Sequence, residues 1–94
     1  MRIERFIWVD AVVDKLLSKH GVNPTEVEEV FENQPRIRWQ ESGHRVGEDL
    51  YAAYGVTNEG RYVIVFFIVK DGRSALIISA RDMESGERRR YERK

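Results

Sequence analysis

At 94 residues, with 41% hydrophobic and 34% charged side chains, the chain has the composition of one folded domain and not of a disordered segment. The absence of cysteine excludes disulfides, thiolate metal sites and thiol nucleophiles. The first residues lack the apolar stretch of a signal peptide, and no apolar run approaches the roughly 18 residues of a membrane span. We therefore expect a single domain over residues 1–94 that works in the cytoplasm and contacts no membrane.

The charges sum to zero but are divided unevenly along the chain. Up to Glu59 there are seven Lys and Arg against eleven Asp and Glu, whereas from Gly60 onward there are nine against five. A basic C-terminal third suits contact with phosphates or with an acidic partner. A solvated, charged helix would give the same counts, so both interpretations stay open.

The N-terminal segment predicts a strand that leads into a helix. Residues 5–9 are short, apolar and aromatic, and Asp10 follows them in a position suited to cap a helix. Apolar residues then recur at helical spacing over residues 11–20, and Gly21 follows a basic last turn. A glycine in that position is typical of a helix end.

A second helix is predicted directly after the first. Asn23 can serve as its N-cap, Pro24 as its first helical residue, and Glu26 as the third-position partner of a capping box. The helix is expected to end around residues 33–35, because proline disfavours helical geometry in the residue before it.

The rest of the chain predicts an antiparallel sheet and a terminal helix. Residues 36–40 alternate basic and apolar side chains, which is typical of an edge strand with two different faces. Three further strands follow, separated by short polar turns, at residues 49–57, 61–69 and 73–81. The charged remainder, residues 82–94, reads as a helix. The order of strand, two helices, three or four antiparallel strands and a helix predicts an α+β fold.

Four stretches of the chain together resemble the BrnT-type toxins, which are ribonucleases related in fold to the RelE toxins. They are residues 8–10, the KHGV of residues 19–22, the pair Val30 and Phe31, and the C-terminal IISARDM with ERRRY after it. The resemblance implies a RelE-like fold and a toxin of a type II toxin–antitoxin system that cleaves RNA without a metal or other cofactor. It also implies an antitoxin encoded in the same operon, and contact with DNA only through the complex with that antitoxin.

Three positions depart from the pattern of this family. Leu50 stands where an arginine is common, Val56 where many members carry a basic or polar residue, and Asp82 where a lysine often follows ISAR. The loss of these cations supports a second hypothesis, in which the protein is a non-catalytic binding module. Such a module keeps the toxin fold and binds an antitoxin or a transcriptional regulator.

A metal-independent ribonuclease uses the 2′-hydroxyl of RNA as its nucleophile, so the protein must remove one proton, supply another and neutralise charge on the transition state. Arg81 is the first catalytic candidate, because a guanidinium offers phosphate a planar fork of donors and stays charged. The alternative for Arg81 is an ion pair with Asp82 or Glu84. The period of two in a strand predicts that Arg81 shares a face with Arg73, Ala75, Ile77 and Ser79.

Three further residues are candidates for proton transfer. His20 and His44 have pKa values that lie near neutrality when unperturbed, and Glu48 can act as a base. His20 falls in the last turn of a helix, where a histidine also complements the helix dipole. His44 lies in a polar loop that the sheet can bring near the site. Two histidines without a carboxylate cluster predict no metal site.

Candidate substrate-binding residues lie in the C-terminal half. Arg61, Lys70 and Arg73 flank the hairpins and can hold flanking phosphates, or can simply be solvated. Tyr91 can orient a phosphate or stack on a base, as aromatic groups do for single-stranded RNA, or can belong to the core. The aromatic residues of the strands are assigned to packing. They are Tyr51, Tyr54, Tyr62, Phe66 and Phe67.

Overall fold

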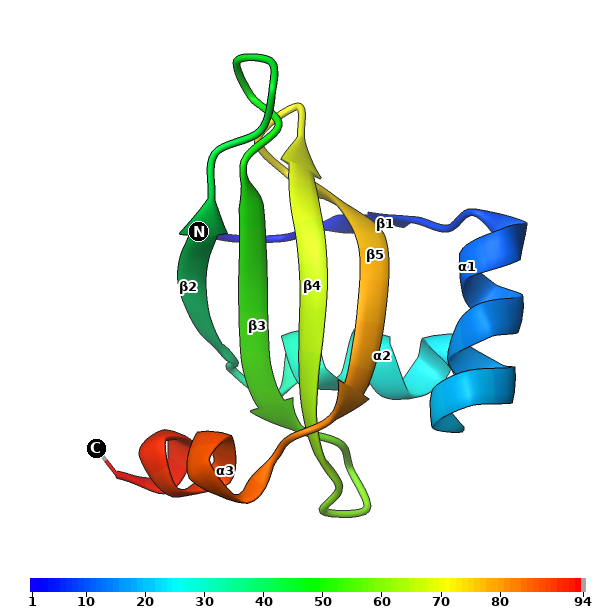
Figure 1. Cartoon of the computed structure of the whole chain (residues 1–94), viewed down its shortest axis with the longest axis vertical. Helices are drawn as coiled ribbons and strands as arrows, with labels where there is room; N and C mark the ends of the chain where they lie inside the picture. The colour runs from blue at the N-terminus through cyan, green and yellow to red at the C-terminus, as the bar shows by residue number, and fades with distance from the viewer. Residues whose placement is uncertain (94) are drawn as a thin grey trace.

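A computed structural model describes residues 1–93 (Figure 1). It contains a five-stranded sheet that is covered by the N-terminal helices on one face and carries the C-terminal helix at one end of the other. The elements in chain order are β1 (Arg5–Ile7), α1 (Asp10–Lys15), η1 (Leu16–His20), α2 (Pro24–Glu32), β2 (Arg36–Glu41), β3 (Leu50–Val56), β4 (Tyr62–Lys70), β5 (Ser74–Asp82) and α3 (Ser85–Glu92). The strand order is β1-β5-β4-β3-β2, with β1 parallel to β5 and the other neighbours antiparallel. The predicted α+β fold with two N-terminal helices and a C-terminal helix is confirmed. Across these residues no helix combines the length and apolarity needed to span a bilayer.

The first predicted helix is continuous over α1 and η1, and its last turn has π-helical geometry, which the sequence pattern did not predict. Asp10 is the first helical residue and not the cap, because Val9 occupies the N-cap position with an extended backbone. Gly21 ends the helix in the left-handed conformation at φ 61°, as predicted.

The capping box of α2 is confirmed. The Asn23 side-chain oxygen accepts a hydrogen bond of 2.9 Å from the Glu26 backbone N–H, and Glu26 accepts one of 3.1 Å in return. The helix packs directly on β3, where a Cβ added at Gly55 would lie 2.8 Å from Cγ1 of Val30. Glycine at position 55 therefore permits this close approach.

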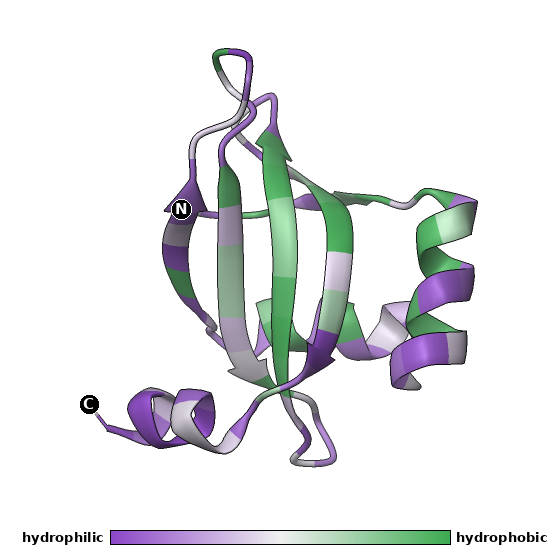
Figure 2. Ribbon diagram, viewed as in Figure 1, coloured by the Kyte–Doolittle hydropathy of each residue, from purple (hydrophilic) through white to green (hydrophobic). Residues whose placement is uncertain are grey.

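The hydrophobic core lies between the sheet and the helices α1, η1 and α2. Helical side chains such as Leu16 and Val30 pack there against alternate residues of β3, β4 and β5, and Phe67 is the largest fully buried side chain. Figure 2 shows apolar residues concentrated along β4, whereas α3 is largely hydrophilic. The opposite face of the sheet carries α3 at one end only, and we call it the open face.

A β-bulge divides β5 into two parts of different orientation. Phe67 pairs with Ile77, but Val65 pairs with Ala80, so β5 contains one more residue than β4 between these pairs. The extra residue reverses the alternation after Ile77. The prediction of one continuous face containing Arg73, Ala75, Ile77, Ser79 and Arg81 is therefore wrong: Ala75 and Ile77 face the helices, whereas Ser79 and Arg81 lie on the open face.

Candidate functional site

Four residues from four strands form a row across the open face. Register pairs Arg36 of β2 with Tyr54 of β3, Tyr54 with Ile64 of β4, and Ile64 with Arg81 of β5. Ile64 is only 1% exposed, so the row has an apolar centre with one arginine at each side. At a strand spacing of about 4.8 Å, the two arginine backbones lie roughly 14 Å apart.

Arg81 forms a two-pronged ion pair with Glu87 at the start of α3. Its Nη1 donates to Oε1 at 2.8 Å and its Nη2 donates to Oε2 at 2.9 Å. Nη1 also donates to the Asp82 carbonyl at 3.1 Å, and the guanidinium lies 5.7 Å from the centroid of the Phe66 ring. The bonds to Glu87 raise the pKa of Arg81 and lower the pKa of Glu87, so both groups are charged at neutral pH. The ion pair considered from sequence exists, but its partner is Glu87 and not Asp82 or Glu84.

Glu87 also organises the first turn of α3. Its Oε1 accepts a hydrogen bond of 2.8 Å from the Glu84 backbone N–H, which completes a capping box. The Glu87 side chain is 13% exposed, against 31% for Arg81. One carboxylate therefore holds the helix start and the end of β5 together.

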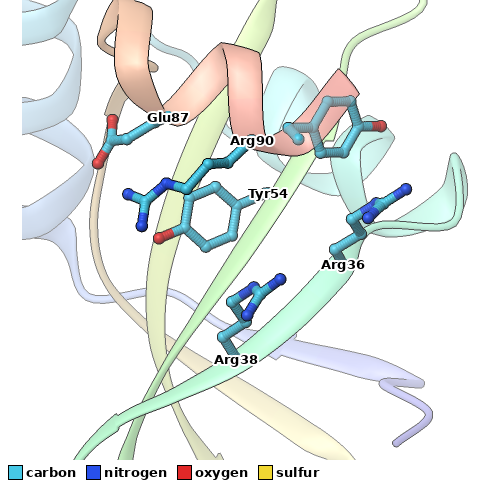
Figure 3. A pocket seen from close by; sticks show the side chains of 6 residues that line it. Arg36, Arg38, Tyr54, Glu87 and Arg90 are labelled. Atoms are coloured by element: carbon cyan, nitrogen blue, oxygen red, sulfur yellow. The ribbon is translucent and has the colours of Figure 1, made fainter. Parts of the chain in front are cut away.

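A small pocket of about 80 Å³ lies between β2, β3 and α3 (Figure 3). Arg36 and Arg38 approach it from β2, Tyr54 from β3, and Glu87 and Arg90 from α3. Its sixth lining residue is Tyr91. Three arginines and one glutamate line a volume well below the roughly 300–1,000 Å³ of pockets for drug-sized ligands. The pocket is suited to a small anion such as one phosphate group.

No residue of α3 is fully buried. The helix is therefore held at the end of the open face by polar and cation–π contacts. The Arg88 guanidinium lies 3.9 Å from the Tyr62 ring centroid, and the Tyr62 and Tyr91 rings meet edge to face at 5.9 Å. The Tyr62 hydroxyl donates to Glu92 at 3.0 Å. Arg36 lies 5.6 Å from the Tyr91 ring centroid and donates to the carbonyl of residue 93 at 3.2 Å.

Four of the candidates from sequence lie at the opposite end of the sheet from this pocket. Glu48 accepts a hydrogen bond of 3.1 Å from Nζ of Lys70, and His44 is exposed in the loop between β2 and β3 (Figure 1). Arg73 ends the turn between β4 and β5 at the same end. The structure therefore brings Arg81 and Tyr91 together near the pocket, but not with His44, Glu48, Lys70 or Arg73.

Arg61 connects the start of β4 to the helical layer. Its Nε donates to Asp82 at 2.6 Å, its Nη1 bonds Glu26 and the Gly21 carbonyl, and its Nη2 donates to the His20 carbonyl at 2.9 Å. The bond to Asp82 is the main cause that raises the pKa of Arg61. Asp82, which departs from the family pattern, thus binds a cation of its own chain, and His20 lies with Arg61 on the helical side.

Five pocket residues were not proposed from sequence. The alternation over residues 36–40 correctly placed Arg36 and Arg38 on one face, but it gave no sign that this face is the open one. Tyr54 was assigned to packing, and Glu87 and Arg90 were read only as part of a charged helix. Within residues 1–93, no group of three or more His, Asp or Glu side chains is arranged to hold a metal ion.

The fold and the pocket define a small α+β protein that presents guanidinium groups on one face of an antiparallel sheet. Residues 8–87 match the family described as "Ribonuclease toxin, BrnT, of type II toxin-antitoxin system", and the chain belongs to this family. The structure is similar to the crystal structure of the Brucella abortus ribonuclease toxin BrnT, with a TM-score of 0.62 and 16% sequence identity over 87% of this chain and 100% of that one. That likeness shows the shared fold. No curated protein sequence matches the chain.

Proposed function

We propose that the protein is an endoribonuclease that cleaves RNA without a metal ion, with its active site at the Arg81–Glu87 pair and the neighbouring pocket. Family membership supports a ribonuclease toxin. The observation that carries the proposal is that Arg36, Arg38 and Arg90 all line a phosphate-sized pocket whose wall includes Glu87.

In this proposal the cations bind the scissile phosphate and stabilise the transition state. Arg36, Arg38 and Arg90 hold the phosphate in the pocket, and Arg81 transfers its fork of donors from the Glu87 carboxylate to a phosphate oxygen. A guanidinium bound at the oxygen where charge develops lowers the barrier, because its positive charge stabilises the negative charge of the transition state. Arg81 is thus the catalytic cation, as proposed from sequence.

Release of Arg81 also prepares Glu87 to act as the general base. The hydrogen bonds from Arg81 are the main cause that lowers the pKa of Glu87, so their loss makes this carboxylate more basic. Glu87 takes the proton of the 2′-hydroxyl, the 2′-oxygen forms a bond to phosphorus, and the bond to the 5′-oxygen breaks. We assign the Tyr54 hydroxyl as the acid that protonates the leaving oxygen. The products are a 2′,3′-cyclic phosphate and a 5′-hydroxyl.

The remaining candidates from sequence take more distant roles in the proposal. Tyr91 stacks on a base beside the pocket. Lys70 and Arg73, at the other end of the sheet, stay predicted contacts for distant phosphates. His20, His44, Glu48 and Arg61 take no part in the chemistry proposed for the pocket, and Arg61 instead stabilises the fold.

Incubation of purified protein with single-stranded RNA in excess chelator tests the proposal. We expect cleavage that leaves 2′,3′-cyclic phosphate ends, and a loss of about 100-fold or more for Glu87→Gln and Arg81→Ala. Arg45→Ala, in the exposed loop at the other end of the sheet, is the matched control and should cleave like the unaltered protein. A requirement for added metal, or equal cleavage by Arg81→Ala, would contradict the mechanism.

A second candidate function is a non-catalytic module that binds its antitoxin in the cytoplasm. It is favoured by the occupied fork of Arg81 and by Leu50 and Val56, which place apolar side chains on the open face. The discriminating result is recovery of an antitoxin encoded in the same operon together with intact RNA. Antitoxin binding accompanied by cleavage in chelator would exclude the module.

A further inference from the structure

A wider groove adjoins the phosphate-sized pocket. It has a volume of about 720 Å³, which lies within the roughly 300–1,000 Å³ of ligand pockets. Its lining residues are Asn33, Gln34, Arg36, Tyr62, Tyr91 and Glu92. Arg36 and Tyr91 line the groove and the pocket alike, so they form the wall that the two share. A ligand with its phosphate in the pocket would therefore place its next group in the groove.

The groove walls have the chemistry of a surface for unpaired bases. The walls contain the aromatic rings of Tyr62 and Tyr91 and the planar guanidinium of Arg36. The Tyr62 ring contacts the Tyr91 ring, which in turn lies beside the Arg36 guanidinium. Unpaired RNA bases stack on tyrosine rings and on arginine planes, and such stacking tolerates every base. Stacking alone would therefore give affinity without selecting a base.

Gln34 supplies the polar side chain of the groove that is not already engaged, because Asn33 donates to Val56 and Asn58 and Glu92 accepts from the Tyr62 hydroxyl. It is exposed, and no hydrogen bond among residues 1–93 engages its side-chain amide. An amide presents a donor beside an acceptor, which is the pattern needed to bind a base edge through two hydrogen bonds. The groove thus combines stacking surfaces with one group able to discriminate between bases.

The backbone of Gln34 is strained, which marks the position as special. Its φ is 56°, a left-handed conformation that residues with a Cβ disfavour, and the following Pro35 restricts it further. The same conformation at the end of the first helix is occupied by Gly21. Gln34 follows the C-cap of α2, where a left-handed residue is usually glycine, so the chain keeps a strained glutamine at a position that glycine would relieve.

We propose that the groove is a nucleobase subsite, and that Gln34 selects the RNA base next to the phosphate bound in the pocket. This inference rests on the proposed ribonuclease function and names the part of the substrate that determines where cleavage occurs. Tyr91 and Arg36 stack on the base and the Gln34 amide bonds its edge, while Tyr62, whose ring already contacts Arg88, supports the Tyr91 ring edge to face.

The test is equilibrium binding of short, fully 2′-O-methylated RNA oligonucleotides, which cannot be cleaved. They differ only in one central nucleotide, which carries each of the four bases or no base, and binding is followed by fluorescence anisotropy. We expect the unaltered protein to prefer one base about 10-fold over the least favoured base and over the abasic oligonucleotide. In Gln34→Gly this preference should fall within 2-fold, while the melting temperature rises by about 4 °C as the strain is relieved.

Gln40→Ala is the matched control, because Gln40 is the other glutamine of the chain and bonds carbonyls of its own strand. It should keep the full base preference. Equal binding of abasic and base-bearing oligonucleotides by the unaltered protein, absence of any binding, or an unchanged preference in Gln34→Gly would overturn the inference. A base preference that depends on Gln34 in a protein unable to cleave RNA would leave the subsite standing and refute the proposed ribonuclease.

Discussion

Arg81 donates from two nitrogens to the two carboxylate oxygens of Glu87, at 2.8 and 2.9 Å. This geometry is the one that a guanidinium offers to phosphate, so Glu87 and an RNA phosphate compete for the same fork of donors. The pair lies beside the pocket and not in the core, with the Arg81 side chain 31% exposed.

The first prediction concerns Glu87→Gln. Loss of the charge should weaken the pair and lower the free energy of unfolding by about 1 kcal/mol, the magnitude of a partly exposed ion pair. Affinity for uncleavable RNA should rise at the same time, because Arg81 is released for phosphate. Urea unfolding and anisotropy measure the two effects, with Glu59→Gln in an exposed turn as the control. A fall in RNA affinity for Glu87→Gln would oppose competition at Arg81.

The second prediction is a dependence of stability on acid pH. The ion pair holds the pKa of Glu87 below its ordinary value of 4.5, so the folded protein binds this proton less readily than the unfolded chain. The stabilisation from Glu87 is therefore complete above pH 4.5 and is lost as the pH falls through the lowered pKa. The difference in urea midpoint between the unaltered protein and Glu87→Gln should be largest near pH 7 and should shrink below pH 4. A difference that grows in acid would contradict the assigned direction.

The third prediction tests whether Arg61 stabilises the fold or contacts an RNA phosphate. Because its guanidinium bonds Asp82, Glu26 and two backbone carbonyls, Arg61→Ala should lower the free energy of unfolding by about 2 kcal/mol. Arg61→Lys should recover little of this loss, since one ammonium cannot reproduce a planar fork. RNA affinity of the folded variant should stay unchanged. A lower affinity at full stability would instead support the phosphate contact considered from sequence.

The fourth prediction concerns how firmly α3 is held. Removal of the Arg88 guanidinium, 3.9 Å from the Tyr62 ring centroid, should cost about 0.5–1 kcal/mol of docking. Amide hydrogen exchange within α3 should then be about 2- to 5-fold faster in Arg88→Ala, with the sheet amides unaffected. Arg89→Ala changes the exposed neighbouring arginine and serves as the control. Equal exchange in the two variants would show that the ring contact does not hold the helix.

Local patterns in the sequence correctly predicted the features that depend on residues two to four positions apart. The capping box of Asn23 and Glu26, the helix end at Gly21 and the alternation that puts Arg36 and Arg38 on one face all follow from such short-range geometry. The order of elements followed from the same patterns. The resemblance to the toxin family followed from the order of the matching stretches, and family membership confirms it.

Tertiary structure alone decided which side chains share the site. The bulge in β5 moves Arg81 to the open face, because one extra residue reverses a period of two that the sequence pattern assumes throughout. Pairing of Arg81 with Glu87, six residues away, requires the chain to leave the strand and begin a helix before the two side chains meet. The row from Arg36 to Arg81 joins four strands, and its alignment depends on strand register, which no single segment of the sequence contains.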